Sequence, residues 1–153
     1  MRLVPAALVA ASLLACPISA ASPPPHTDRT AETERNRAIV VDFFNLLMVR
    51  RKVREAYEKY VATDYIQHNP NVPGGRQGFL DYFSKFAKPG PIVDTLREVL
   101  VSITAEGDRV VLVFKQRYPD PKDATKFYFT HSFDMLRIEN GKIAEHWDSD
   151  LKR

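Results

Sequence analysis

The sequence contains one cysteine, Cys16, near the start of a chain of 153 residues. A lone cysteine excludes an internal disulfide framework, and this one lies outside the predicted folded region, so it is not a catalytic thiol. Glycine is also scarce, and none of the six glycines belongs to a Gly-rich loop of the kind that cradles phosphates. No nucleophile motif and no internal repeat are present. The remaining guides are the charge balance, the apolar periodicity and the placement of ionisable side chains.

An excess of charge of one sign is missing as well. Lysine and arginine number 22 against 19 acidic residues, which gives a net charge of +3. Removal of Arg2 with the leader described below would leave 21 against 19. A nucleic-acid-binding surface requires a basic stripe, whereas the basic residues at 50–54 form a local cluster that we interpret as a solvated helix junction. The composition therefore argues against nucleic acid as a partner.

Long apolar runs are confined to the beginning of the chain. Arg2 is followed by an apolar run over residues 3–14, and the small residues at 19–21 suit signal-peptidase cleavage. We therefore predict a bacterial secretory signal at residues 1–21 and a periplasmic or secreted protein. No later run reaches the length of a membrane-spanning helix, so we predict no transmembrane segment.

The end of this leader has a second interpretation. Leu13-Leu14-Ala15-Cys16 resembles a bacterial lipobox, in which Cys16 would carry a lipid anchor and become the new N-terminus. Simple cleavage that removes Cys16 is the alternative. In both cases we predict a Pro-rich linker at residues 22–33, because consecutive prolines favour an extended chain. One folded domain is then predicted at residues 34–153.

Three amphipathic helices are predicted in the first half of the domain. The first begins near Thr30, the second runs to Ala62, and the third begins near Arg76 and ends before Pro89. Each carries one apolar stripe, which must pack against another element because short isolated helices are marginally stable. The stripes are Val40, Phe43, Phe44 and Leu47, then Val53, Ala56, Tyr57, Tyr60 and Val61, and then Phe79, Tyr82, Phe83 and Phe86.

Strand patterns dominate the second half. Asn140-Gly141 joins the last two strands and favours a type I′ hairpin turn, since both residues tolerate a positive φ. Helices followed by strands that are joined through hairpins indicate an α+β fold with an antiparallel sheet. The predicted strands cover residues 92–105, 109–118, 126–138 and 142–150, and a short extended piece covers residues 65–69.

The strand over residues 126–138 has two unlike faces. The odd positions are mostly apolar, and an exposed row of phenylalanines would form a patch of the kind that marks an interface. We therefore predict that the even face lines a cavity under the helices and that the odd face meets a second subunit in a homodimer. The reverse assignment would put His131 in the cavity. The odd face comprises Phe127, Phe129, His131, Phe133 and Met135, and the even face Tyr128, Thr130, Ser132, Asp134, Leu136 and Ile138.

Several motifs together resemble one known family. They are Tyr65-Ile66-Gln67-His68-Asn69-Pro70, Ala105-Glu106-Gly107-Asp108, Asp134-x-x-Arg137 and Gly141-Lys142-Ile143-x-Glu145-His146-Trp147-Asp148. Over about residues 34–148 the chain resembles the SnoaL-like (polyketide cyclase-like) group of the nuclear transport factor 2-like superfamily. The resemblance implies three N-terminal helices packed on a curved antiparallel sheet, a cone-shaped half-barrel with a central pocket, usually in a dimer. Members include polyketide cyclases, steroid isomerases, epoxide hydrolases, dehydratases and non-catalytic modules, so the fold alone says little about function.

The candidate catalytic residues are Asp134 and His68. A carboxylate and an imidazole in a dry pocket can remove a proton next to a carbonyl and deliver one to the developing alkoxide. The similarity to the cyclases supports Asp134 in particular. Two structural alternatives stay open, in which Asp134 pairs with Arg137 or His68 caps the loop that follows it. Relatives often carry histidine on the strand that here contains Val113 and Lys115, which puts an inherited proton-transfer role in doubt.

Six further residues are candidate ligand contacts. Tyr65 can donate a hydrogen bond to an oxyanion, and Gln67 and Asn69 can orient a ligand carbonyl. On the last strand, the side chains of His146 and Asp148 share one face, and that of Trp147 lies on the other. The candidates are Tyr65, Gln67, Asn69, His146, Trp147 and Asp148. The histidines and aspartates follow no known ligand spacing, so we predict neither a metal nor another cofactor.

Two functions from different classes fit these residues. The first is a cofactor-independent acid–base enzyme, such as an aldol-type cyclase, isomerase or hydrolase, that acts on a small apolar carbonyl compound. The second is a non-catalytic periplasmic module that binds a small-molecule ligand or dimerises. The positions of Asp134 and His68 discriminate between them, because acid–base work requires both groups near one point of a cavity.

Overall fold

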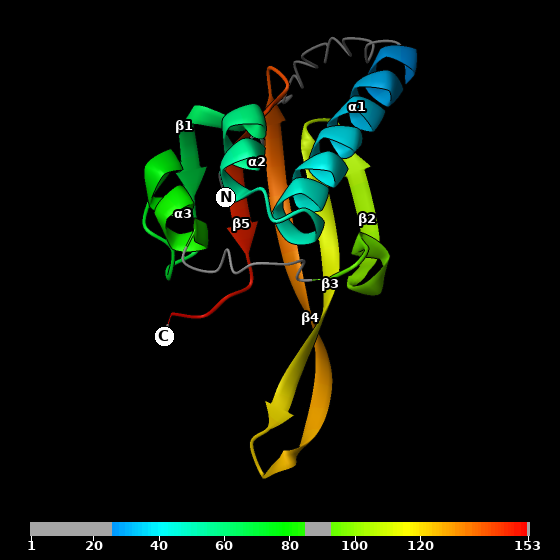
Figure 1. The fold of residues 1–153 in the computed structure, drawn as a ribbon. Helices are drawn as coiled ribbons and strands as arrows, with labels where there is room; N and C mark the ends of the chain where they lie inside the picture. The colour runs from blue at the N-terminus through cyan, green and yellow to red at the C-terminus, as the bar shows by residue number, and fades with distance from the viewer. Residues whose placement is uncertain (1–25, 85–92, 153) are drawn as a thin grey trace, which may run out of the picture.

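The computed structural model describes residues 26–84 and 93–152. Helices come first along the chain, and a five-stranded sheet follows, with one strand inserted between the second and third helices (Figure 1). The helices are α1 (His26–Phe44), which continues into a π-helical turn (Asn45–Val49), α2 (Val53–Tyr60) and α3 (Gly75–Ser84). The strands are β1 (Val61–Gln67), β2 (Leu100–Glu106), β3 (Arg109–Asp120), β4 (Asp123–Glu139) and β5 (Lys142–Asp148).

The predicted α+β class is confirmed, and the sheet is mixed. Its strand order is β1-β5-β4-β3-β2, in which β1 runs parallel to β5 and the other neighbours are antiparallel. The second helix ends at Tyr60 instead of Ala62, because the chain turns extended at Val61 and joins the edge of β5. The short extended piece predicted at residues 65–69 is thus the end of a longer strand, whose Val61 and Tyr65 side chains are buried.

Two other boundaries differ from the predicted ones. The strand expected from residue 92 begins at Leu100, because Thr95 and Glu98 form a reciprocal capping box that starts a short 3₁₀ turn (Leu96–Glu98). The first helix begins at His26, inside the segment predicted as linker, and not near Thr30. The expected end of the third helix before Pro89 lies outside the described residues, and the same is true of the predicted signal and of Cys16.

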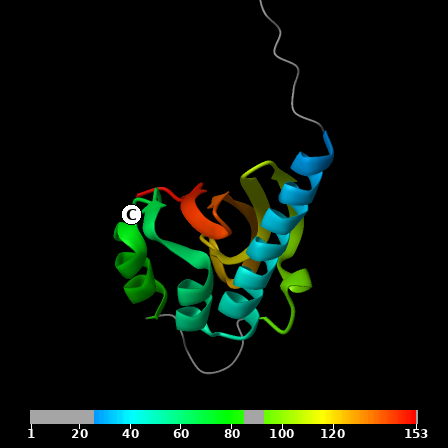
Figure 2. The same cartoon turned by 90° about the horizontal axis from the view of Figure 1, so that it is seen from above.

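The helices cover one face of the sheet (Figure 2). α1 is held to the turn between β2 and β3 by two hydrogen bonds, in which Asn36 Nδ2 donates to the Gly107 carbonyl and the Gly107 N–H donates to Thr33 Oγ1. At the other end of the helix, the Phe44 ring packs on Phe114 of β3 with ring centroids 5.1 Å apart. The apolar stripes of the helices and the inner face of the sheet therefore share one core.

The hairpin between β4 and β5 confirms the predicted turn. Asn140 has a φ of 50° and Gly141 a φ of 73°, which are the left-handed conformations that a type I′ turn requires. β4 carries a register shift between Arg137 and Ile138 just before this turn. The hairpin fixes which side chains of β4 and β5 lie opposite one another, and so it positions the site described below.

The two faces of β4 are assigned as predicted in the part that passes under the helices. Leu136 and Ile138 are buried and Asp134 borders a cavity, whereas Phe133 on the odd face is 51% exposed. β3 and β4 continue together beyond the helices as a long two-stranded arm (Figure 1). On this arm Phe127 and Phe129 of the odd face are 50% and 58% exposed, and Tyr128 of the even face is exposed as well, because the arm extends past the layer of helices.

None of the helices in residues 26–84 and 93–152 is long and apolar enough to cross a membrane.

Candidate functional site

A cavity of about 230 Å³ lies between the helices and the inner face of the sheet. Its wall is dominated by aromatic and aliphatic side chains, and a few polar groups interrupt it, which is the usual composition of a small-molecule site. The polar and tyrosine side chains on the wall are Arg51, Tyr57, Tyr65, Gln116, Asp134 and His146. The apolar side chains are Phe43, Phe44, Leu47, Met48, Val53, Val61, Phe79, Phe83, Phe114, Leu136 and Ile143.

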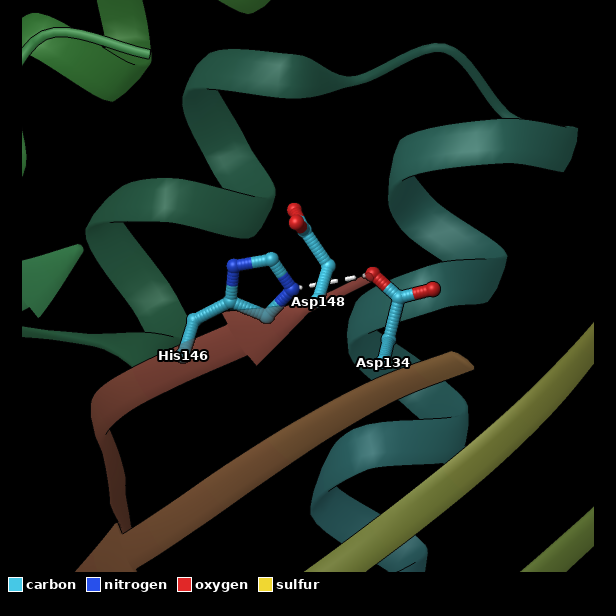
Figure 3. A group of neighbouring side chains, drawn as sticks. All are labelled: Asp134, His146 and Asp148. Atoms are coloured by element: carbon cyan, nitrogen blue, oxygen red, sulfur yellow. Dashed lines mark hydrogen bonds and ion pairs between the residues drawn. The ribbon is translucent and has the colours of Figure 1, made fainter. Parts of the chain in front are cut away.

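Asp134 and His146 form a hydrogen-bonded pair on the wall of this cavity (Figure 3). His146 Nε2 lies 2.9 Å from Asp134 Oδ1, and the side chains are 10% and 20% exposed. The strand pairing brings them together, because His146 lies opposite Leu136 in the β4–β5 ladder and Asp134 is two residues before Leu136 on the same face. A carboxylate and an imidazole are thus held in contact where water is largely excluded.

Gln67 of β1 determines which nitrogen of His146 carries a proton. The backbone N–H of Asn69 donates to Gln67 Oε1 at 2.9 Å, and this identifies the oxygen of the amide, because a backbone N–H is only a donor. His146 Nδ1 lies 2.9 Å from the same oxygen and must therefore be the protonated nitrogen that donates to it. Nε2 then faces Asp134 across a bond that holds one shared proton, in either the imidazolium–carboxylate or the imidazole–carboxylic acid form.

Tyr65 and Asn69 extend this network behind the pair. Gln67 Nε2 donates to the Tyr65 hydroxyl at 3.0 Å, and Asn69 Nδ2 donates to Asp148 Oδ2 at 2.5 Å. Asp148 lies directly opposite Asp134 in the β4–β5 ladder. Three of the predicted ligand contacts, Gln67, Asn69 and Asp148, therefore already bind one another or His146. Of the six predicted ligand contacts, Tyr65 and His146 line the cavity.

The predicted pairing of Asp134 with His68 is wrong. His68 follows Gln67 at the end of β1, so its side chain lies on the opposite, outer face of the sheet. There His68 Nε2 contacts Glu145 Oε1 at 2.7 Å, and the imidazole stacks on the Trp147 ring at a centroid distance of 4.9 Å. Trp147 is likewise on the outer face and away from the cavity, so it is not placed as a ligand contact.

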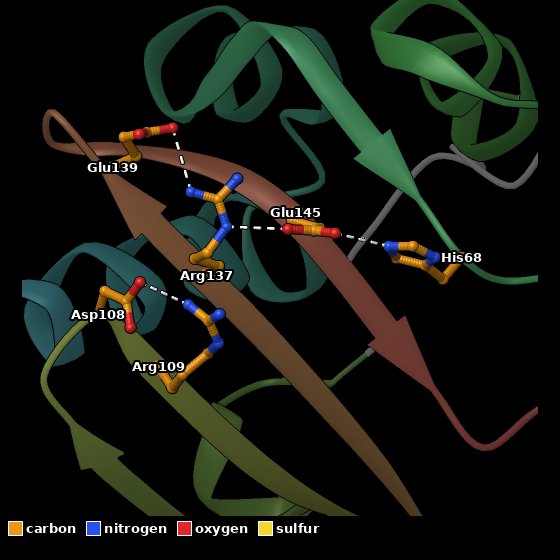
Figure 4. Close-up of polar contacts among 6 residues, drawn as sticks. All are labelled: His68, Asp108, Arg109, Arg137, Glu139 and Glu145. Atoms are coloured by element: carbon orange, nitrogen blue, oxygen red, sulfur yellow. Dashed lines mark hydrogen bonds and ion pairs between the residues drawn. The ribbon is translucent and has the colours of Figure 1, made fainter.

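The alternative pairing of Asp134 with Arg137 is also wrong. Arg137 belongs to the outer face, where its Nε donates to Glu145 at 2.8 Å and its Nη1 donates to Glu139 at 3.1 Å (Figure 4). His68, Glu145, Arg137 and Glu139 form a continuous chain of polar contacts across β5 and β4, behind the cavity. Arg137 is therefore bound to Glu145 and Glu139 on the outer face, and Asp134 is bound to His146 on the inner face.

The polar contacts of Glu145 on the outer face make the stability of the fold depend on pH. Hydrogen bonds from His68 and then Arg137 hold the pKa of the Glu145 carboxyl below its ordinary value of 4.5. A depressed folded-state pKa stabilises the fold above the unfolded pKa, and this stabilisation is lost as the pH falls through the lower folded value. We therefore expect the Tm of the unmodified protein to fall below pH 4.5 and Glu145→Gln to flatten this fall.

Thermal unfolding between about pH 6 and about pH 2.5 measures this effect. Glu58→Gln is the matched control, because Glu58 is an exposed helix residue whose nearest arginine contact is 3.6 Å long. An acid-dependent fall of Tm that is equally steep in Glu145→Gln and in the unmodified protein would contradict the assignment.

Within residues 26–84 and 93–152, Asp134, His146 and Asp148 form a group that could hold a cation. One ligand atom from each lies within 4.8 Å of the others, and carboxylate oxygen with imidazole nitrogen is a donor set that divalent transition metals accept. All three residues already make hydrogen bonds in this arrangement, since Nε2 binds Asp134 and the Asp148 oxygens accept from Asn69 Nδ2 and the Asp150 N–H. A metal would have to displace these bonds, and the prediction of a metal-free site is retained as a prediction.

Sequence reasoning missed two features of this site. His146 was placed on the correct face of its strand but not paired with Asp134, because the register of the β4–β5 hairpin sets that contact. Tyr57 belongs to an apolar helical stripe that predicts core packing, although the residue also lines the cavity. The position of Tyr57 next to Tyr60 in a helix with one apolar face gives no signal that would separate a ligand contact from a core residue.

The chain was compared with protein families and with solved structures. A family model described as the SnoaL-like domain matches residues 40–146. No curated protein matches. Structural neighbours include a presumed SnoaL-like polyketide cyclase from Jannaschia sp. CCS1, with a TM-score of 0.57 and 15% identity over 80% of this chain and 90% of that one. A presumed ketosteroid isomerase from Kribbella flavida has a TM-score of 0.54 and 17% identity over 80% and 83%. TsrD from Streptomyces laurentii has a TM-score of 0.51 and 19% identity over 76% and 87%.

Proposed function

The chain belongs to the SnoaL-like family, and from that premise we propose that it is a cofactor-independent acid–base enzyme for a small, largely apolar carbonyl compound. The observation that carries the proposal is the Asp134–His146 pair on the wall of a mainly apolar cavity. The neighbours in structure are named as polyketide cyclases, a hydroxylase and a ketosteroid isomerase, so the fold is compatible with several reactions. Cyclisation by aldol addition and isomerisation both begin with enolisation and are therefore the reactions that we propose.

Proton removal next to a carbonyl is the first step in aldol closure and in isomerisation. The Asp134 carboxylate takes the proton as the α C–H bond breaks, the C–H electron pair forms the carbon–carbon double bond of an enolate, and the carbonyl π pair moves to oxygen. His146, with Nδ1 held by Gln67, stabilises the carboxylate through Nε2 and can pass the shared proton on when the product forms. The pair thus supplies both a base and an acid without a cofactor.

The cavity wall can bind an apolar ligand and exclude water from it. Seven aromatic rings line it, and burial of an apolar ligand against such rings contributes about 25 cal/mol for each Å² removed from water. Exclusion of water also strengthens the interaction between Asp134 and the developing charges of the reaction. These properties favour a compact, mainly hydrocarbon compound with one reactive carbonyl.

The test is α-proton exchange in heavy water. The protein is incubated with a panel of small apolar ketones, and proton NMR follows the replacement of α hydrogen by deuterium. This readout detects enolisation whatever reaction follows. Catalysed exchange in at least one ketone is the expected result, and binding without exchange across a panel that fills the cavity would contradict the proposal.

One observation favours the second candidate, a non-catalytic binding module. The inner network from Tyr65 through Gln67 and His146 to Asp134 is continuously hydrogen-bonded, as a purely structural network would be. Ligand binding with no exchange would select this function. The same cavity would then serve as a carrier or sensor site for an apolar small molecule.

The role of Gln67 can be checked by itself. We expect Gln67→Met, which keeps the length of the side chain but removes the amide oxygen, to release His146 Nδ1 and shift the ring proton toward Nε2. The ¹⁵N chemical shifts of the imidazole report that change directly, and exchange should slow by about tenfold, which corresponds to roughly 1.4 kcal/mol. Gln77→Met on the exposed face of α3 is the control. Unchanged ¹⁵N shifts in Gln67→Met would refute the tautomer assignment.

We also propose that the outer face of β4 meets a second copy of the chain. The support is the exposed row Phe127, Phe129 and Phe133, which is larger than the scattered apolar residues of an ordinary surface. Two copies of such a face are self-complementary across a two-fold axis. The expected assembly is a homodimer in which each copy keeps its own cavity.

Export to the periplasm or the medium is proposed from the N-terminal pattern. Residues 1–21 carry the charged start, apolar run and small-residue site of a secretory signal. Mass spectrometry of the mature N-terminus distinguishes cleavage near residue 21 from lipidation at Cys16, because the two products differ in both sequence and mass.

A further inference from the structure

The site contains two carboxylates and a single proton, which Asp134 shares with His146. Asp148 lies directly opposite Asp134 in the β4–β5 ladder, an arrangement in which like charges repel. Within residues 26–84 and 93–152, neither carboxylate forms an ion pair with a lysine or an arginine. Two carboxylates and one shared proton leave a net charge of −1 where water is largely excluded. The site is therefore one positive charge short of neutrality.

The nitrogen of His146 that faces Asp134 is oriented as a metal ligand would be. Gln67 Oε1 keeps a proton on Nδ1, so Nε2 presents a lone pair whenever the shared proton leaves. Histidines that bind metals usually donate their other ring N–H to an acceptor of this kind. Asn69 Nδ2 positions the Asp148 carboxylate in a comparable way. The three side chains project to the same side of β4 and β5 (Figure 3).

The distances fit a metal ion after a small movement. Bonds of about 2.1 Å from a metal to nitrogen and to oxygen span about 2.9 Å at a right angle and about 3.4 Å at the tetrahedral angle. His146 Nε2 and Asp134 Oδ1 are 2.9 Å apart, which is the spacing of two ligands on one ion. One oxygen of Asp148 lies within 4.8 Å of both ligand atoms, so an approach of less than about 2 Å supplies the third ligand.

We propose that Asp134, His146 and Asp148 bind a divalent transition-metal ion of the Zn²⁺ class and that this ion inhibits the enzyme. The shared proton leaves to solvent, and Nε2 and one oxygen of each carboxylate donate lone pairs to the ion, which brings the site to neutrality. The Asp134 lone pair that would remove an α proton is then occupied. The metal-free state is the active one, so the inhibitory part of the proposal rests on the function proposed above.

The donor set also predicts which ions bind. Imidazole nitrogen suits Zn²⁺, Ni²⁺ and Cu²⁺, whereas Ca²⁺ and Mg²⁺ select sites made of oxygen ligands alone. We therefore expect Zn²⁺ to bind in the presence of a large excess of Mg²⁺. Tight binding of Mg²⁺ that displaces Zn²⁺ would contradict a ligand role for His146.

Isothermal titration calorimetry measures the binding without reference to activity. The protein is purified without a polyhistidine tag, stripped with EDTA, dialysed and titrated with Zn²⁺. We expect one saturable ion per chain and, in Asp148→Asn, an affinity lower by about 100-fold or more, since loss of an outer partner alone costs about 10–100-fold. Asp150→Asn removes an exposed carboxylate two residues further along the chain and should change the affinity less than about threefold.

A second variant leaves all three ligands in place. Gln67→Met is expected to weaken Zn²⁺ binding by about tenfold, because the ring proton moves toward Nε2 and competes with the ion. Both variants should keep the helical circular dichroism of the unmodified protein. Equal Zn²⁺ affinity in Asp148→Asn, Asp150→Asn and the unmodified protein would overturn the proposed site.

The α-proton exchange assay tests inhibition separately. Saturating Zn²⁺ should lower the exchange rate at least about tenfold, and EDTA should restore it; exchange that is unchanged or faster with Zn²⁺ bound would overturn inhibition. If no ketone exchanges but Zn²⁺ binds and Asp148→Asn weakens it, the acid–base function fails and the metal site stands. If exchange occurs and Zn²⁺ does not bind, the metal site fails and the acid–base pair stands.

Discussion

Asp134→Asn is expected to reduce α-proton exchange by a factor of about 10³, which is within the range that a positioned general base contributes. Asparagine has nearly the same size and can still contact His146 across the β4–β5 ladder. Its amide cannot accept a proton from carbon, so the base is lost while the shape of the cavity is kept. Exchange rates from NMR in heavy water, at saturating and at low ketone concentration, measure the loss in each regime.

A matched substitution shows whether the loss is specific. Asp81→Asn removes a carboxylate from the exposed face of α3 and should leave the exchange rate within about twofold of the unmodified protein. The Asp134→Asn protein should keep its oligomeric state and its helical circular dichroism. A folded, fully active Asp134→Asn protein would remove this carboxylate from the mechanism and leave the binding module as the better description.

Phe129→Glu is expected to convert the proposed homodimer into monomers. Phe129 is the most exposed phenylalanine of the outer face of β4, and burial of such a ring against a partner contributes about 1.5–3 kcal/mol in each copy. A carboxylate in its place would be taken out of water at the centre of the interface, which costs several kcal/mol when it is unpaired. Sedimentation velocity over a range of protein concentrations measures the change.

The monomer itself should tolerate this substitution. Lys115 Nζ lies 4.2 Å above the Phe129 ring, so an introduced carboxylate would have a cation beside it and would be solvated in the separate chain. Tyr128→Glu is the control, because Tyr128 lies on the other face of the same arm at a similar exposure. If Phe129→Glu remains dimeric while Tyr128→Glu dissociates, the interface is on the inner face of the arm and the face assignment is wrong.

Local patterns were sufficient for much of the framework. The apolar stripe of Val40, Phe43 and Phe44 marks the buried face of α1, because helical spacing alone decides which residues share a face. The Asn140-Gly141 turn was predictable since few other residue pairs accept two positive φ values. Alternation along β4 likewise separated Asp134 from the exposed phenylalanines.

The parallel pairing of β1 with β5 was not predictable from local patterns. The two strands are about 80 residues apart in the chain, and no turn sequence connects them. A segment that follows a helix and contains alternating polar residues is equally consistent with a loop. Its strand conformation depends on the free edge of β5, which exists only after the sheet has formed.

The amino-acid sequence by itself determined the α+β class, the family, the β4–β5 hairpin and the faces of β4, because each depends on short-range periodicity, turn chemistry or motif identity. Only the tertiary structure decided that Asp134 pairs with His146, that His68 lies on the outer face, and that Tyr57 is buried at the cavity wall. These contacts join residues from different elements. They depend on strand register and on the docking of helices, and short-range sequence patterns do not encode such distances.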